Sequence, residues 1–379
     1  MDFRLGEDAE QFRAEVRAFL SDSITEEKAE EYYRSGVLAD KDFVAEAVAA
    51  GYLRGDTFAG GNGESVWRDR IIDEEFLRAE APTYAFGTTA GVARVVESFG
   101  NDELKAEIVQ PAYAGEIIIG YGYSEPESGS DVAAAQTRAV RNGDSWVING
   151  SKMFTTNAHV ADYIFLLART NPEAPKHNGL TMFVVPVKAT PGFEAQAVYT
   201  LSGERTNITF YDDVRIPDRY RVGDVDAGWK VITHSLQEEH GAGFGGPFDR
   251  MVEAAECWAE DADRLGEADV LARLGKAATE VEVSLLIQRR AHWLAAHGTV
   301  PLTEGPMSKL FSSERLERAS EDLTDLIGPD GLRSYYEPTA PQHGKVEHML
   351  RFSVGTTIYA GASEVQRNII AQQGLGLPR

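Results

Sequence analysis

The chain has 379 residues, of which 43% are hydrophobic and 26% charged, and its formal net charge is −23. This length predicts two or three packed domains, and the acidic excess argues against binding to nucleic acid or to anionic membranes, which select basic surfaces. The single cysteine, Cys257, excludes an internal disulfide and a cysteine-based metal cluster, and no metal site is expected.

Residues 1–118 have the composition of a helical domain. Apolar residues recur three and four positions apart, as in Phe12, Val16 and Leu20, which is typical of helices with one buried face. The glycine-rich run at residues 60–63 predicts a loop between helices. The acidic start of the chain lacks a signal-peptide core, and no apolar run is long enough to span a bilayer, so a cytoplasmic protein is expected.

Residues 119–225 are rich in β-branched and aromatic residues and predict a compact β domain. The clearest strand candidates are residues 163–168, 180–187 and 206–210. Between Ser145 and Phe154, the dipeptide Asn149-Gly150 predicts a two-residue hairpin turn, because asparagine and glycine suit a type I′ turn.

Residues 226–379 return to a helical pattern, with stretches at 228–264, 268–297, 306–328 and 345–373. The first stretch is expected to break near Gly245, Gly246 and Pro247. The order α, β, α differs from the strand–helix alternation of a doubly wound sheet, so the predicted fold class is α+β. The Gly-x-Gly-x-x-Gly match that starts at Gly241 follows a helical stretch rather than a strand, so a nicotinamide-binding Rossmann domain is not expected.

One motif has the chemistry of a flavin cradle. Residues 121–132 read YGYSEPESGSDV. Gly129 and Ser130 can present backbone N–H groups to an anionic diphosphate, Ser124 can offer a hydroxyl to the polar edge of a flavin, and Tyr121 and Tyr123 can pack against its ring. Taken alone, such a run is more often a loop and a helix cap.

Three further segments follow in order: KMFTTN at 152–157, TNITFYDDVRIP at 206–217 and IYAGASEVQRNII at 358–370. Each is weak evidence by itself, since Phe154 could be a core aromatic and Thr156 a strand former. In this order, and together with residues 121–132, they resemble the signatures of the acyl-CoA dehydrogenase family.

The resemblance implies an N-terminal helical domain (1–118), a middle β-barrel or sandwich domain (119–225) and a C-terminal four-helix bundle (226–379). It also implies FAD as cofactor, an acyl-CoA that is oxidised to its 2-enoyl thioester, and an electron-transfer flavoprotein or similar acceptor. Phe154 stands where the family usually has a tryptophan. The residues implied at the cofactor are Tyr121, Tyr123, Ser124, Gly129, Ser130, Phe154, Thr155, Thr156 and Glu364. Those implied at the substrate are Ser130, Ala360 and Gly361.

The usual catalytic base is missing. Many family members carry a glutamate where this chain has Ala360, which cannot accept a proton but still offers a backbone N–H to the thioester carbonyl. A subset of the family places the glutamate earlier, in a Leu-x-x-Glu-Arg pattern, and residues 236–240 read LQEEH, which makes Glu239 the candidate base. His240 replaces the arginine and, unlike arginine, can be neutral at pH 7. Without the resemblance, Glu239 would be read as a solvated helix carboxylate beside Glu238.

The resemblance also bears on assembly. Family members are usually tetramers in which a neighbouring subunit's Arg-x-x-Phe-Gly segment contacts the FAD diphosphate. Residues 256–266, ECWAEDADRLG, contain no such segment, and DLIGP at 325–329 departs from the family's Gln-x-x-Gly-Gly. A homo- or heterotetramer with a related subunit is therefore expected.

Two alternatives to this dehydrogenase stay open. One is a non-catalytic or FAD-binding subunit of a heteromeric enzyme. The other is a relative with oxidase, monooxygenase or carrier-protein-bound chemistry. The sequence does not identify the acyl group among short, long, branched and steroid-derived chains.

Overall fold

The structure is a computed structural model that describes residues 6–35, 39–55, 66–188, 190–238, 243–297, 299 and 301–378. Its contacts group the chain into two compact units. Unit 1 comprises Met1–Glu30, Gly60–Ala81 and His240–Arg379, and unit 2 comprises Glu31–Ala59 and Pro82–Glu239. The three domain ranges expected from the sequence remain a prediction.

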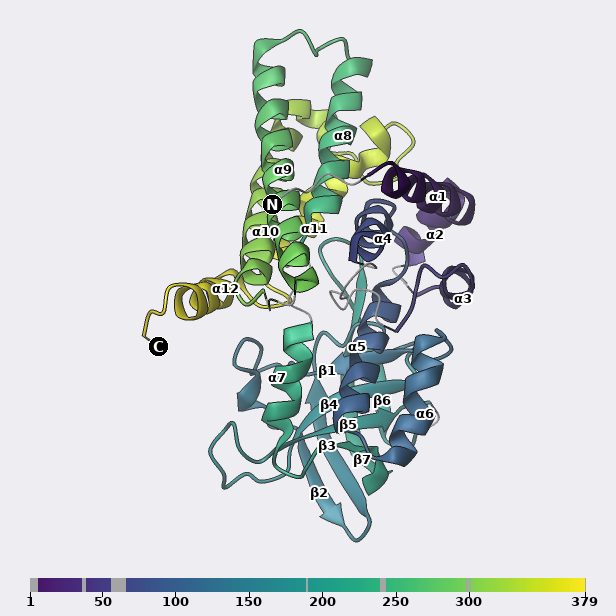
Figure 1. Ribbon diagram of the computed structural model, residues 1–379, viewed down its shortest axis with the longest axis vertical. Coiled ribbons are helices and arrows are strands. Elements are labelled where there is room, and N and C mark those ends of the chain that lie inside the picture. Colours follow the sequence, from purple (N-terminus) through teal and green to yellow (C-terminus); the bar gives the residue numbers. More distant parts are fainter. Residues whose placement is uncertain are drawn as a thin grey trace. The chain divides into compact units, whose positions relative to one another are not determined.

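The described part of unit 2 contains an eight-stranded mixed sheet (Figure 1). The strands follow the order β6-β7-β3-β2-β4-β5-β8, and β1 pairs in parallel with β4. Their bounds are β1 Ile119–Gly122, β2 Arg138–Asn142, β3 Ser145–Lys152, β4 Tyr163–Arg169, β5 Leu180–Pro186, β6 Phe193–Tyr199, β7 Arg205–Pro217 and β8 Arg221–Val222. The strands expected at 163–168, 180–187 and 206–210 correspond to β4, β5 and part of β7.

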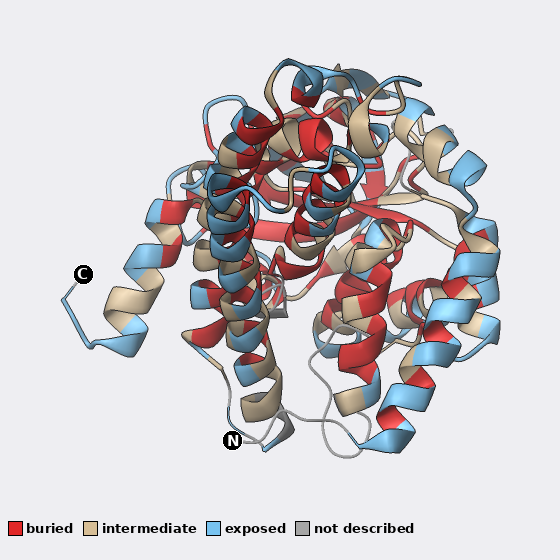
Figure 2. Ribbon diagram, turned by 90° about the horizontal axis from the view of Figure 1, so that it is seen from above, coloured by how far each residue is buried: buried red, intermediate tan, exposed pale blue. Residues whose placement is uncertain are grey.

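The core of unit 2 lies at β4 and β5, whose side chains are buried along nearly their whole length. Figure 2 colours the buried residues of the chain red. Continuous apolar strands of this kind are typical of strands covered on both faces. Helix α5 contacts β1, and α7 contacts β5. The helices that lie within this unit are α3 Lys41–Ala49, α5 Tyr84–Phe99, α6 Asp102–Tyr113 and α7 Gly228–Glu238, and α2 Glu26–Ser35 spans the boundary between the units.

The hairpin predicted at Asn149-Gly150 is wrong. Strand β3 continues through both residues, and the turn lies earlier, between β2 and β3, where Gly143 has φ +64°. The register of β3 against β7 shifts between Ile148 and Gly150, which marks a β-bulge. A Cβ atom at Gly150 would lie 2.8 Å from Thr137 Cα. Close packing against the neighbouring backbone therefore accounts for this glycine.

Gly150→Ala is expected to lower the free energy of unfolding by about 2–3 kcal/mol, because φ is +146° and the new methyl group would overlap Thr137. Gly143→Ala is the control, since it has a positive φ but no atom within 4 Å of the added Cβ, and a loss of about 1 kcal/mol is expected. Urea unfolding of both variants measures the difference. Equal losses would contradict the close contact with Thr137.

Unit 1 is helical in its described part, and Figure 1 shows α8, α9 and α10 as its long helices. Its helices are α1 Glu7–Ser23, α4 Val66–Arg78, α8 Gly245–Asp261, α9 Ala268–Ala296, α10 Glu304–Ile327, α11 Lys345–Thr356 and α12 Ser363–Ile369, which a π-helical turn at Ile370–Gly374 follows. Short 3-10 helices lie at Val132–Ala134 and Asp218–Tyr220 in unit 2 and at Gly328–Leu332 and Pro341–Gly344 in unit 1. Among the described helices, none combines the length and apolar character needed to cross a bilayer.

One expectation about these helices is confirmed and another needs correction. The stretch expected at 228–264 is interrupted as predicted, because α7 ends at Glu238 and α8 begins at Gly245; Pro247 lies in the first turn of α8, where the N–H groups lack intrahelical partners. The single helix expected over 345–373 is divided into α11 and α12, because Ala360 and Gly361 adopt left-handed φ values of +51° and +87°.

His348 on α11 predicts an acid-sensitive fold in unit 1. Its ring stacks on Tyr335 (centroids 4.6 Å apart), and burial, with the nearby Arg351 and Arg250, lowers its pKa to about 3. Because the folded pKa lies below the unfolded value of about 6.5, the folded state resists protonation. Its contribution to stability is complete above about pH 6.5 and is lost as the pH falls toward 3.

Between about pH 7.5 and pH 5, His348→Phe is expected to lose about 2 kcal/mol less of its free energy of unfolding than the wild type does. The phenylalanine keeps an aromatic ring against Tyr335 but cannot take up a proton. Urea unfolding of both proteins at the two pH values measures the change. An acid-induced loss of the same size in both proteins would rule out this role for His348.

Candidate active site

In unit 2, the segment after β1 and the end of β3 lie side by side. The backbone N–H of Met153 donates to Ser124 O (2.8 Å), and Lys152 Nζ donates to Tyr123 O (3.1 Å). These bonds bring the predicted residues Tyr121, Tyr123 and Ser124 together with Phe154, Thr155 and Thr156. We call residues 121–130 and 152–156 the cradle.

A buried ion pair forms the base of the cradle. Lys152 Nζ lies 2.8 Å from Glu125 Oε1, and the Glu125 carboxylate also accepts the backbone N–H groups of Gln136 (2.7 Å) and Thr137 (2.8 Å). Burial lowers the pKa of Lys152 to about 8. Burial alone would raise the pKa of Glu125, but Lys152 and the two N–H groups hold it below its usual value.

The motifs did not single out Lys152 or Glu125 as site residues, although both lie within them. The signal that could have identified this pair is chemical. A charged residue is almost never fully buried without a partner. The side chain of Lys152 is 0% exposed and that of Glu125 is 7% exposed.

Phe154 projects from the cradle toward solvent. It has a left-handed φ of +59°, which is uncommon for a residue other than glycine, and it is 58% exposed. Tyr121 and Tyr123 are half-buried and stack with centroids 4.8 Å apart, while Gly129 and Ser130 are exposed. An exposed aromatic ring on a strained backbone is a feature that points to ligand binding.

The residues that follow Phe154 fix this conformation. Thr155 is fully buried, its N–H donates to Asn207 O (2.9 Å), and Asn207 Nδ2 donates to Thr155 O (3.0 Å). The hydroxyl of Thr156 lies 3.2 Å from that of Thr206. Strand β7 therefore holds the backbone on which Phe154 stands.

Ala360, Gly361 and Glu364 form a second group, in unit 1, at the turn between α11 and α12. Gln366 Nε2 donates to Ala360 O (2.9 Å), and Lys309 Nζ donates to Gly361 O (2.7 Å). Burial lowers the pKa of Lys309 to about 8. No described residue accepts a hydrogen bond from the Ala360 N–H. Glu364 is exposed in the first turn of α12.

Glu239, the predicted base, lies outside the described residues, between the end of α7 at Glu238 and Gly243. Gly243 and Gly245, on its C-terminal side, have a packing role. A Cβ atom on Gly243 would lie 2.6 Å from Ser308 Oγ, and one on Gly245 would lie 2.8 Å from Leu285 Cδ2. Contact with α9 and α10 therefore explains these glycines without a ligand.

Three family models match consecutive parts of the chain. The acyl-CoA dehydrogenase N-terminal domain matches residues 6–116, the middle domain residues 120–214 and the C-terminal domain residues 226–375. The acyl-CoA dehydrogenase FadE26 of Mycobacterium tuberculosis is 33% identical over 98% of this chain and 97% of its own length. FadE29 of the same organism is 32% identical over 84% of this chain and 83% of its own length. The chain belongs to the acyl-CoA dehydrogenase family.

Solved structures agree with this family assignment. The Tcur3481-Tcur3483 steroid ACAD has a TM-score of 0.91 at 31% identity, and the ChsE4-ChsE5 complex from Mycobacterium tuberculosis has a TM-score of 0.89 at 32% identity, each covering 100% of both chains. The predicted acyl-CoA dehydrogenase-like α+β fold is thereby confirmed. As a member of the acyl-CoA dehydrogenase family, the chain is an oxidoreductase.

Two buried polar atoms, one in the cradle and one on His159 just after it in the chain, are compatible with a bound cofactor such as FAD. The Ser128 hydroxyl and His159 Nε2 are buried, and no described residue hydrogen-bonds to either atom. A buried polar atom without a partner is costly unless a ligand or water satisfies it. Together with the exposed ring of Phe154, these atoms suit a ligand that combines a planar ring with polar groups.

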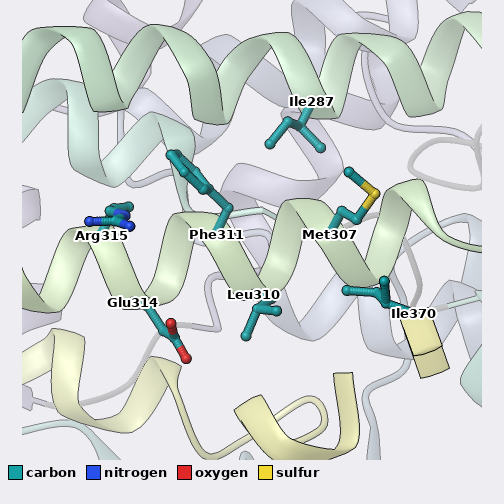
Figure 3. Close-up of a pocket in the computed structure, with 7 residues that line it drawn as sticks. All are labelled: Ile287, Met307, Leu310, Phe311, Glu314, Arg315 and Ile370. Atoms are coloured by element: carbon teal, nitrogen blue, oxygen red, sulfur yellow. The ribbon is translucent and has the colours of Figure 1, made fainter. Parts of the chain in front are cut away.

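Unit 1 also contains a pocket of about 240 Å³ that none of the predicted site residues line. Figure 3 shows Ile287 of α9 and Met307 and Phe311 of α10 facing a shared space. The full lining is Ile287, Met307, Leu310, Phe311, Glu314, Arg315 and Ile370. Glu314 pairs with Arg367 (2.6 Å) and Arg315 with Glu280 (3.4 Å). Within the described ranges, no cluster of His, Cys, Asp or Glu could hold a metal ion.

Proposed function

We propose that this acyl-CoA dehydrogenase binds FAD at the cradle and oxidises an acyl-CoA to the 2-enoyl thioester. The observation that carries the proposal is Phe154, which is 58% exposed at a φ of +59° on a segment that is hydrogen-bonded to the one carrying the stacked Tyr121 and Tyr123. Tyr121, Tyr123, Ser124, Gly129, Ser130, Phe154, Thr155, Thr156 and Glu364 are the residues proposed to hold the cofactor. Bound FAD supplies the acceptor for the hydride that leaves the β-carbon.

Glu239 acts at the α-carbon of the substrate and Ala360 at its thioester carbonyl. Glu239 takes the α-proton on its carboxylate, a task for which a general base must lie within hydrogen-bond reach of that proton. The N–H of Ala360 donates to the thioester oxygen as negative charge develops there. The absence of an acceptor for this N–H among the described residues supports the second role. Ser130 and Gly361 contribute to the substrate site.

We further propose that the working enzyme is a tetramer with a related acyl-CoA dehydrogenase subunit and that the acyl group is bulky. Residues 256–266 lack the Arg-x-x-Phe-Gly segment that would reach a neighbour's FAD. Two similar structures bear the names of two proteins each, and one of them is titled a steroid ACAD. An electron-transfer flavoprotein or similar acceptor would reoxidise the flavin.

Anaerobic titration with a panel of short, long, branched and steroid-derived acyl-CoA thioesters tests the proposal. The chain, with and without candidate partner subunits, is expected to lose flavin absorbance with one class of thioester. FAD binding without bleaching by any thioester would favour the non-catalytic subunit, and rapid oxygen uptake without an added acceptor would favour an oxidase. A homo-oligomer that purifies from this chain alone with one tightly bound FAD per subunit would exclude the heteromeric assembly.

A further inference from the structure

A buried lysine of α10 contacts the turn between α11 and α12. Lys309 is 5% exposed, and its Nζ donates to Gly361 O at 2.7 Å. Among the described residues, this carbonyl oxygen is the hydrogen-bond acceptor of the ammonium, and no carboxylate forms an ion pair with it. Glu314 and Glu364 act on Lys309 only through their charge. The direct polar contact of Lys309 is therefore with the backbone of the turn.

This placement of a cation is unfavourable for stability. A buried ammonium loses its hydration, and a hydrogen-bonded carboxylate can compensate for that loss, as Glu125 does for Lys152. Lys309 has no such carboxylate among the described residues. Burial lowers its pKa to about 8, so it is still mostly charged at pH 7. Titratable groups perturbed by burial are concentrated at functional sites, and here the contact leads to the Ala360 turn.

The turn has a backbone conformation that needs support. Ala360 and Gly361 have left-handed φ values of +51° and +87°, and the conformation is strained for the alanine. Gln366 Nε2 donates to Ala360 O (2.9 Å), so the carbonyl oxygens of both turn residues are held. Because peptide groups are planar, these two bonds fix the two peptide planes that follow the Ala360 N–H.

The Ala360 N–H is available to a ligand. Ala360 is exposed, and within the described part of the chain no residue accepts a hydrogen bond from this N–H. Its direction relative to α12 depends on the φ of Ala360. If Gly361 O were released, the alanine could relax toward the negative φ that it ordinarily prefers, and the N–H would point in a different direction.

We propose that Lys309 is a positioning residue, whose hydrogen bond to Gly361 O keeps the Ala360 N–H directed at the oxygen of the bound thioester. The inference rests on the proposed function, in which this N–H stabilises the charge that develops on that oxygen. A neutral lysine amine also has N–H groups to donate, so the contact is kept when Lys309 loses its proton. The simpler alternative is a bond that only fastens α12 to α10.

Lys309→Met keeps the length of the side chain and removes its donor. It is expected to lower kcat for the best thioester about tenfold, less than the roughly 100-fold loss typical when such a donor is removed outright. KM is expected to change less than about twofold, because the N–H acts mainly on charge in the transition state. The urea midpoint is expected to stay the same or rise, since a buried charge without an ion-pair partner is removed.

Arg367→Met is the matched control. Arg367 of α12 pairs with Glu314 of α10 (2.6 Å), so this variant breaks another contact between the same two helices and leaves the turn carbonyls untouched. It is expected to keep the wild-type kcat. Equal losses of kcat in Arg367→Met and Lys309→Met would overturn the inference, because they would show that the packing of α12 on α10 is what matters.

The stretching frequency of the thioester carbonyl reports the Ala360 N–H directly, because a hydrogen bond to the oxygen lowers it. Infrared difference spectra of the bound 2-enoyl thioester, labelled isotopically at the carbonyl carbon, isolate this band. The wild type and Arg367→Met are expected to show the lowered frequency, and Lys309→Met to lose part of the shift. Lys309→Gln keeps an N–H donor on a shorter side chain and is expected to be intermediate, and it replaces Lys309→Met if that variant does not fold. A lower urea midpoint in Lys309→Met with unchanged kcat and carbonyl frequency would overturn the inference.

Failure of the proposed function would be distinguishable from failure of this inference. If the wild type binds the enoyl thioester without a change in carbonyl frequency, the role of the Ala360 N–H is wrong and the inference falls with it. If the wild type shows the change and Lys309→Met keeps both this change and the wild-type kcat, only the positioning role of Lys309 is wrong. FAD content, measured in every variant, separates slower chemistry from cofactor loss.

Discussion

Replacement of Glu239 by glutamine is expected to lower kcat for acyl-CoA oxidation by at least about 100-fold, because the amide cannot accept the α-proton. FAD content is expected to stay at the wild-type level, since Glu239 lies outside the cradle. Rapid-reaction measurement of flavin bleaching under anaerobic conditions reports this step directly. Glu238→Gln, one position earlier, is the matched control and is expected to retain most of the activity.

The base can also be moved. Adding Ala360→Glu to the Glu239→Gln variant is expected to recover about tenfold of the lost activity, because many family members carry their glutamate at this position. The backbone there already accepts a side chain at φ +51°, and Gln366 and Lys309 hold the turn through the carbonyls of Ala360 and Gly361. Full activity of Glu239→Gln alone would show that a different residue takes the proton.

Lys152→Met is expected to lower the free energy of unfolding by about 3–5 kcal/mol and to reduce FAD content, because it leaves the buried Glu125 carboxylate without its cation. Lys176→Met is the control. It breaks an ion pair of the same length, 2.8 Å to Asp131, whose side chains are 52% and 55% exposed, and such exposed pairs contribute about 0–1 kcal/mol. Urea unfolding and flavin absorbance of the purified variants measure both effects.

A double variant tests the physical reason for this loss. Glu125→Gln together with Lys152→Met removes both charges, and it is expected to recover part of the stability that Lys152→Met loses, because no charge then remains buried without a partner. The N–H groups of Gln136 and Thr137 bind separate oxygens of Glu125, and the single amide oxygen of glutamine can accept only one of them, so the recovery is expected to be incomplete. A double variant less stable than Lys152→Met would contradict the importance of the unpaired charge.

The elements that the sequence predicted well are those whose local pattern agrees with their tertiary environment. The apolar runs at 163–168 and 180–187 became β4 and β5, which are buried along nearly their whole length. The hairpin prediction at Asn149-Gly150 was wrong because a tertiary contact determines the backbone there. The two residues favour a turn locally, but Gly150 packs against Thr137 as a bulge within a continuous strand.

The candidate site shows the same division. The order of the motifs identified the cradle segments, and the structure brings Tyr123, Ser124 and Phe154 into one place. The residues that hold those segments were not predicted, because Lys152 and Glu125 meet only after β3 and the segment after β1 have folded together. Lys309 likewise reaches the Ala360 turn from 52 positions away, a distance that no local pattern encodes. The roles of Glu239 and Ala360 remain predictions.

In the proposed function, the turn at Ala360 would bind the thioester carbonyl while Glu239 accepts the proton, so two tasks that the resemblance assigns to one glutamate residue in many relatives would lie on two segments. A backbone amide neither gains nor loses a proton in the physiological pH range, so its support of the thioester carbonyl would be the same in acid and in base. The catalytic step would then depend on pH only through the protonation of the Glu239 carboxylate. Substitutions around the base would then shift the pH optimum of such an enzyme without weakening the hydrogen bond from the Ala360 N–H to the carbonyl oxygen.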